Sequence, residues 1–214
     1  MLNKKVSDLL NEQINKELYS AYLYLDMNNY FDKRGLNGFA NWYMIQAQEE
    51  RDHAMLIYKY MQNNDCPIKL EAIAMPDKVF KADMDVLKAG LEHEEYVTAS
   101  IHTIYDAASK VKDFRTMQFL DWFVKEQGEE ETNARDMISK MELFGADARS
   151  LYMLNQELAG RTYNAPSLVL DKFQSINRRC ARIVPAHLFL NPVPLWLKKL
   201  ISVPLPSTKP TSAS

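Results

Sequence analysis

The 214-residue chain has only two cysteines, Cys66 and Cys180, and they lie far apart in the sequence. Two cysteines are too few for the disulfide scaffold that small secreted domains use. They also lack the Cys-x-x-Cys spacing of zinc sites and of rubredoxin-type iron sites. A cysteine-based metal site is therefore excluded, and we expect the protein to work in a reducing cytoplasm.

The sequence is also poor in glycine and in long apolar runs. It holds six glycines, and no apolar–polar alternation extends between Asn-Gly or Asp-Gly turns, so β-structure has little support. No run of about 18 apolar residues occurs, so we expect no transmembrane helix and no stable membrane association. Scattered charges in the N-terminal stretch MLNKKVSDLLNEQINKEL argue against a signal peptide. The net charge of −2 argues against nucleic acid as the main partner.

Long helical patterns dominate what is present, since Leu, Ala, Glu, Lys and eleven Met favour helix. We predict four long helices and a short fifth, over residues 5–33, 37–63, 81–110, 114–142 and about 147–158. Short connections make the first and second helices antiparallel neighbours, and likewise the third and fourth. Residues 65–80 between the two pairs are long enough to run back along a bundle. The sequence therefore predicts an all-α four-helix bundle with one long crossover, because an up-down-up-down bundle would leave this connection needlessly long.

The C-terminal part of the chain, residues 164–214, differs in composition from residues 1–163. It contains seven of the nine prolines and seven basic residues, but a single acidic residue, Asp171. We therefore predict a bundle domain over 1–163 and a separate, disordered tail over 164–214, or an added extension. The stretches INRRCARIV and PLWLKKLI combine basic and apolar residues, which leaves open a short membrane-surface or partner-binding segment.

Polar residues interrupt the core-facing positions of all four long helices near their middles. Core positions recur every three and four residues, and they are apolar at both ends of each helix. Because helices of similar length bring their midpoints to one height, we expect the interruptions to converge inside the bundle. We call these residues the central set: Glu17, Glu50, His53, Glu94, Gln127 and Glu130.

Four carboxylates cannot share a dry core as anions, because like charges would force several of them to protonate. Two divalent cations would neutralise them, and carboxylate oxygens with an imidazole suit iron or manganese. Each of these residues taken alone has a simpler explanation. A single glutamate can lie at the edge of the core with its carboxylate in solvent, and a single histidine can be a hydrogen-bonded core residue. One interruption on each of four helices, with Glu50-x-x-His53 among them, favours the metal site. We expect the off-face histidines His93 and His102 to lie on the surface.

These residues resemble those of the non-haem bacterial ferritins. The resemblance spans essentially all of residues 1–163 and is carried by NEQINKELYSAYLYLDM, GFANWYMIQAQEERDHAM, LEHEEYVTASI, FLDWFVKEQGEEE and LAGRTY, in family order and spacing. It implies a ferritin-like bundle with a di-iron ferroxidase centre. In that centre, Glu17 and His53 would ligate one iron and Glu50 would bridge the pair. The second iron would be ligated by Glu94 and Glu130.

The resemblance also implies finer features of the centre. Gln127 stands where bacterioferritins have the glutamate of a second Glu-x-x-His pair, so the two iron sites should be unequal and the second should lose its iron more easily. A third iron site would involve Glu49, Glu126 and Glu129, whose alternative is a solvated acidic face. Tyr24 would hydrogen-bond near the centre and supply an electron during oxygen reduction.

The family resemblance further implies an activity and an assembly. Two Fe(II) ions would bind and O2 would take an electron from each, after which the ferric product would hydrolyse to a ferric oxy-hydroxide. The mineral would grow inside a hollow homo-oligomeric shell of 24 subunits. Haem-binding relatives place a methionine shortly before the second-helix histidine, and because Asp52 stands there we expect no haem.

Three other functions are weighed against a ferroxidase store. A rubrerythrin-like peroxidase needs a rubredoxin-like module with four cysteine ligands, which two distant cysteines cannot supply. A non-enzymatic shell subunit should lack an intact inner ligand set, whereas all six positions here are filled. A helical interaction protein would use the central carboxylates only structurally, and substitutions at Glu17 and His53 separate this reading from the first.

Overall fold

The computed structural model describes residues 2–170, and these residues belong to one compact unit, Met1–Asp171. They form five helices and no strand: α1 Lys4–Lys33, α2 Asn37–Asn63, α3 Asp83–Lys110, α4 Phe114–Phe144 and α5 Ala148–Ala159. The predicted all-α bundle is confirmed, with helix ends within two residues of those expected. The third helix begins later than position 81 because the Asp85 carboxylate accepts hydrogen bonds from the backbone N–H groups of Lys81 and Ala82, at 3.1 and 2.9 Å, and caps it there.

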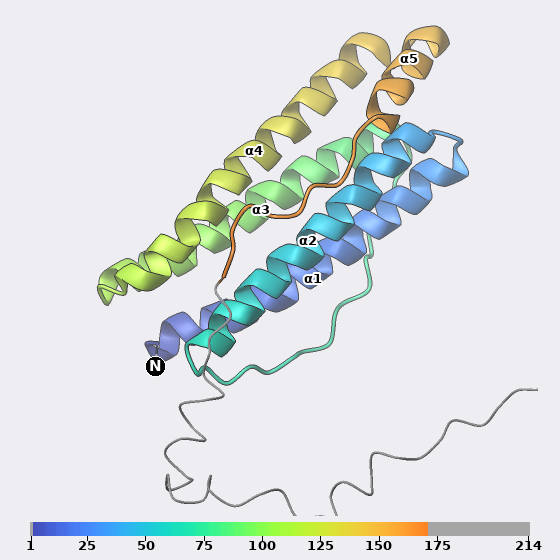
Figure 1. Ribbon diagram of the computed structural model, residues 1–214. Helices are drawn as coiled ribbons and strands as arrows, with labels where there is room; N and C mark the ends of the chain where they lie inside the picture. The colour runs from blue at the N-terminus through green and yellow to red at the C-terminus, as the bar shows by residue number, and fades with distance from the viewer. Residues whose placement is uncertain (1, 171–214) are drawn as a thin grey trace, which may run out of the picture. The chain divides into compact units, whose positions relative to one another are not determined.

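The helices form two antiparallel pairs, α1 with α2 and α3 with α4 (Figure 1). Gly35, with φ of +72°, makes the tight turn between α1 and α2, a conformation that glycine adopts without strain. Residues 64–82 cross from the end of α2 to the start of α3. Asn11 of α1 holds this crossover by hydrogen bonds in both directions with the Lys69 backbone, at 2.8 and 3.0 Å. The single long connection predicted from the sequence is thus fixed along the bundle.

The apolar core is divided into two clusters, one toward each end of the bundle. One cluster contains the stacked rings of Phe31 and Phe39, whose centroids are 5.0 Å apart. The other contains Tyr60 stacked on Phe119, with centroids 3.9 Å apart. Burial of such rings is the main favourable term in folding. A polar layer separates the clusters, as the interrupted helix patterns predicted.

The short helix α5 packs across the start of α2. Helix α2 begins without a side-chain cap of its own, and the Asn155 side-chain oxygen accepts hydrogen bonds from the backbone N–H groups of Gly38 and Phe39, at 2.8 and 3.3 Å. The contact is close, because a Cβ on Gly38 would lie 1.7 Å from the Asn155 backbone oxygen. A glycine at this position therefore lets α5 dock.

The first residues of the predicted tail lie against the bundle. The Trp122 indole N–H of α4 donates to the Ser167 hydroxyl at 2.9 Å, and Leu168 and Leu170 pack against the second core cluster. The rest of the predicted tail, with its basic–apolar stretches and Cys180, lies outside the described residues. Within the described part, no helix is both long enough and apolar enough to cross a membrane.

Candidate metal centre

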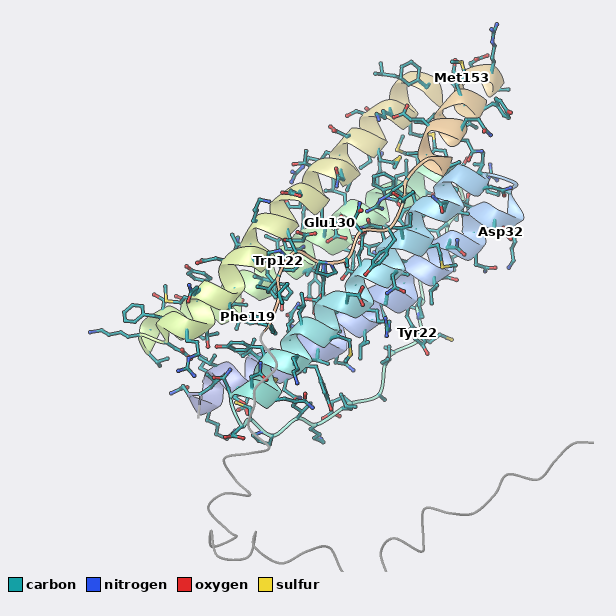
Figure 2. All side chains as sticks on the ribbon, viewed as in Figure 1. Tyr22, Asp32, Phe119, Trp122, Glu130 and Met153 are labelled. Carbon is teal, nitrogen blue, oxygen red and sulfur yellow. The ribbon has the colours of Figure 1, made fainter. Side chains whose placement is uncertain are left out.

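The central set is buried at mid-bundle, as predicted from the helix patterns. Helix α1 supplies Glu17, α2 supplies Glu50 and His53, α3 supplies Glu94, and α4 supplies Gln127 and Glu130; each is at most 5% exposed. In Figure 2, Glu130 lies about midway along α4, on the α5 side of Trp122. Side chains from four separate helices therefore meet in one water-poor layer.

Glu17, Glu50 and His53 form the tightest group in this layer. One potential ligand atom from each lies within 4.8 Å of the others, the only such group found among the described residues. His53 Nδ1 is 3.8 Å from Glu50 Oε1, too far for a hydrogen bond. The ring is held in place by Trp122 and Phe123, whose centroids lie 5.4 and 5.9 Å away.

Four buried atoms of this group have no hydrogen-bond partner: Glu17 Oε2, both carboxylate oxygens of Glu50, and His53 Nδ1. Buried polar atoms nearly always find partners, because desolvation without compensation is costly. Unpartnered oxygens and an imidazole nitrogen that converge are the donor set that a divalent iron or manganese ion takes. The residues present therefore fit a bound metal cation.

The other side of the layer is organised by hydrogen bonds. The Tyr24 hydroxyl donates to Glu94 Oε1, and the Gln127 amide donates to Glu94 Oε2 at 3.1 Å. The Gln46 amide donates to Glu130 Oε2 at 2.8 Å. These neutral donors fix the orientation of the Glu94 and Glu130 carboxylates, as outer partners of metal ligands commonly do.

The electrostatics of the layer favour carboxylates that are neutralised by bound cations over carboxylates that stand as free anions. Burial and the neighbouring Glu50 charge raise the pKa of Glu17 well above the usual range. Burial and the neighbouring Glu94 charge do the same to the pKa of Glu50. Burial and the adjacent Glu130 raise the pKa of Glu94 to about 8. Without metal, Glu94 therefore holds its proton for most of the time at neutral pH, and a bound cation would replace that proton.

Tyr24 lies directly beside the layer, as predicted. Its ring is 1% exposed and lies 5.7 Å from the Tyr43 ring, centroid to centroid. Burial and the adjacent Glu94 raise the pKa of the Tyr24 phenol, so it remains a hydrogen-bond donor at neutral pH. Its hydroxyl proton points at the Glu94 carboxylate, a candidate metal ligand.

The three residues expected at a third iron site lie outside the tight group. Glu49 Oε2 pairs with the Arg161 guanidinium at 2.7 Å, and Glu129 pairs with Lys125 at 2.9 Å on the surface. Glu126 is half-buried, and burial raises its pKa. Burial likewise raises the pKa of Glu49 to about 7, against the opposing effect of Arg161.

One histidine was placed wrongly by sequence reasoning. His93 is 8% exposed rather than on the surface, and its Nε2 lies 2.7 Å from the Ser20 hydroxyl. Ser20 itself donates to the Lys16 backbone oxygen, so the His93 Nε2–H donates to Ser20. Burial lowers the pKa of His93 to about 4, which keeps it neutral. His102 is exposed, as expected.

Sequence reasoning also missed the amides that orient the ligands. Gln13 donates to Glu17 Oε1 at 2.9 Å, and Gln46 donates to Glu130. Both glutamines are fully or almost fully buried, on the same helix faces as the ligands. Their signal was present, because each is a polar residue at a core position one turn before a candidate ligand.

The sequence matches the ferritin-like domain family over residues 7–144. The bacterial non-heme ferritin of Campylobacter jejuni is 39% identical over 156 residues, covering 73% of this chain and 93% of that protein. The bacterial non-heme ferritin of Staphylococcus saprophyticus is 38% identical over 164 residues, covering 77% of this chain and 98% of that protein. The crystal structure of a novel open pore ferritin from the hyperthermophilic archaeon Archaeoglobus fulgidus aligns with a TM-score of 0.74 at 42% identity, covering 76% of this chain and 100% of that chain.

Proposed function

Because this chain belongs to the ferritin family, whose members store iron, we propose that it is a ferroxidase that oxidises Fe(II) with O2 at a di-iron centre within the bundle. The observation that carries the proposal is the set of four buried, unpartnered atoms on Glu17, Glu50 and His53. A purely structural role would compensate the two carboxyls only by a proton shared between Glu17 and Glu50, and would leave His53 Nδ1 without a partner. Iron supplies the missing partner.

Each residue of the central set takes a specific role in this proposal. Glu17 and His53 bind the first Fe(II), and Glu50 bridges to the second with its two unpartnered oxygens. Glu94 and Glu130 bind the second Fe(II). Gln127 holds Glu94 by its amide and offers a weaker, neutral oxygen, so the second site binds iron less tightly than the first.

Fe(II) and O2 are the substrates, and the chain contributes geometry and charge. Two Fe(II) ions give one electron each to one O2, which leaves as H2O2, and the two Fe(III) ions hydrolyse in water to ferric oxy-hydroxide with release of four protons in all. The carboxylates hold two irons close together and balance their charge, while the two core clusters keep bulk water out of the layer. Tyr24 donates its hydroxyl hydrogen bond to Glu94 and is placed to supply a further electron.

We propose that the chain assembles as a homo-oligomeric shell of 24 subunits in the cytoplasm and deposits the mineral inside it. An apolar groove on the outer face of α1 and α2 supports this assembly. Tyr22, Leu25 and Met44 line the groove and are 43–50% exposed in the single chain. Contiguous apolar surface of this kind marks a protein interface, and a second copy of the chain would bury it.

Anaerobic loading of the purified full-length protein with Fe(II), followed by air, tests the ferroxidase. Fast growth of near-ultraviolet absorbance for about two irons per chain, then slower growth in a large particle, is the expected result for a two-iron site. Glu17→Ala and His53→Ala should each abolish the fast phase, because each removes a ligand of the first site.

A matched control exists for each variant: Glu12 lies on the same helix as Glu17, and His102 is a histidine on α3. Glu12→Ala removes an exposed α1 carboxylate and His102→Ala an exposed histidine, and both should keep the fast phase. A fast phase that survives Glu17→Ala and His53→Ala would refute the proposed centre. Fast oxidation by a small particle would keep the centre and refute the shell.

A further inference from the structure

After α5, the chain runs as an extended strap, residues 160–170, from α2 to α4 (Figure 1). It is fixed to α2 by Arg161 and by the Tyr163 hydroxyl, which donates to Asp52 Oδ2 at 2.5 Å. It is fixed to α4 where the Trp122 indole donates to Ser167. The strap therefore passes over the side of the bundle where Glu49 of α2 lies.

Arg161 is the most firmly held residue of the strap. Its Nη2 lies 2.7 Å from Glu49 Oε2, its Nη1 donates to the Trp42 backbone oxygen at 3.3 Å, and its Cζ lies 4.0 Å from the centroid of the Trp42 ring. The Asn41 amide also donates to the Arg161 backbone oxygen at 3.0 Å. Both side chains of the ion pair are at most 17% exposed. A planar guanidinium stacked on an aromatic face and paired with a carboxylate is a well-ordered cation.

This cation stands against one of the three carboxylates that a third iron would need. Glu126 and Glu130 lie near enough to Glu49 for their charges to raise its pKa, so Glu49 belongs to the same acidic neighbourhood as the centre. Arg161 already balances the charge of Glu49, and Lys125 balances that of Glu129. The residues present therefore do not fit a third iron as well as the central set fits two.

We propose that Arg161 is a built-in cation that competes with a third metal ion for Glu49, and so limits the centre to two tightly bound ions. The inference rests on the proposed function, because it concerns a carboxylate at the edge of that centre. A third divalent ion at Glu49 has to displace the guanidinium or bind beside it against charge repulsion. Both routes weaken its binding.

Zinc titration of the full-length, metal-free shell by calorimetry tests this, because Zn²⁺ reports binding without any oxidation. Wild type should bind two Zn²⁺ per chain tightly and a third weakly. Arg161→Gln should tighten the third about tenfold, since it frees a charge-assisted contact in a poorly solvated place. Arg161→Met keeps the packing on Trp42 and should do the same, which covers a failure of the first variant to fold.

Three variants separate the cation from the strap. Arg161→Lys keeps the charge and should keep the third site weak. Tyr163→Phe removes the hydrogen bond of the strap to Asp52 and leaves Arg161 in place. Lys140→Gln breaks the exposed ion pair between Lys140 and Glu157, which are 2.6 Å apart. Neither variant should change the affinity of the third Zn²⁺ site.

The outcomes distinguish this inference from the proposed function. Two tight sites with the same third site in wild type, Arg161→Gln and Arg161→Met overturn the inference alone. Equal tightening in Tyr163→Phe also overturns it, because release of the strap would then be the cause. Absence of two tight sites in wild type overturns the proposed function and this inference with it.

Discussion

Metal binding to the central set should release protons, and the number released follows from the burial of its carboxyls. Glu94 has a pKa of about 8 in the metal-free protein. At pH 7 it therefore holds about 0.9 of a proton, and at pH 9 about 0.1, from the ordinary titration relation. The pKa values of Glu17 and Glu50 are also raised, so release at pH 7 is at least about 0.9 proton per chain.

The assay is addition of Zn²⁺ to weakly buffered, metal-free protein, with released acid followed by an indicator dye. Release should fall as the pH is raised from 7 to 9, because Glu94 loses its proton to solvent before the metal arrives. Glu94→Gln at saturating Zn²⁺ should release about 0.9 proton fewer at pH 7, whereas Glu95→Gln, the exposed neighbour, should match wild type. Release below about half a proton at pH 7, or release that does not change up to pH 9, would refute the reasoning.

Three further predictions concern stability and the second site. Protonated Glu94 contributes about 5 kcal/mol to the free energy of unfolding below about pH 4.5, and this contribution is lost as the pH rises to about 8. The thermal midpoint of the metal-free protein should therefore fall between pH 5 and 8. The thermal midpoint of the Zn²⁺-loaded protein should not fall over this range. Gly38→Ala would place a Cβ 1.7 Å from a backbone oxygen of α5, so it should lower the free energy of unfolding in denaturant by about 3 kcal/mol. In the control Gly128→Ala, the new Cβ meets nothing within 4 Å, so this variant should raise the free energy of unfolding by up to about 1 kcal/mol. Gln46→Leu removes the amide that donates to Glu130 and should weaken the second Zn²⁺ about tenfold in calorimetry, with the first unchanged.

The sequence was sufficient for the bundle and the central set because both follow from periodicity. Apolar residues at three- and four-residue spacing define which face of each helix is buried, and a polar residue on that face must then lie inside. Glu17, Glu50 and Glu94 could be placed this way without knowledge of the helix crossing angles. The long connection of residues 65–80 supplied the topology.

His93 could not be placed by the same rule, because a helix in a bundle contacts more than one neighbour. It lies one position before Glu94 and so points away from the bundle axis, yet it is covered by the rings of Tyr19 and Tyr96, whose centroids lie 5.9 and 6.0 Å from its own. Arg161 was missed for another reason. Its contact with Glu49 depends on the path of the chain after α5, which no periodic pattern encodes.

The two sides of the polar layer differ in their hydrogen bonds, and in the proposed centre this difference sets the order in which two metal ions bind. On the α1–α2 side, Glu17, Glu50 and His53 present unpartnered atoms, so the cost of desolvating them has already been met in the fold. On the α3–α4 side, Glu94 and Glu130 each accept an amide hydrogen bond, which orients the carboxylate and already satisfies one of its oxygens. In the proposed centre, the first ion therefore gains most at the α1–α2 side, and its charge then favours the ionised form of Glu94 for the second. The proposed inequality of the two sites thus has its origin in the hydrogen bonds of their carboxylates.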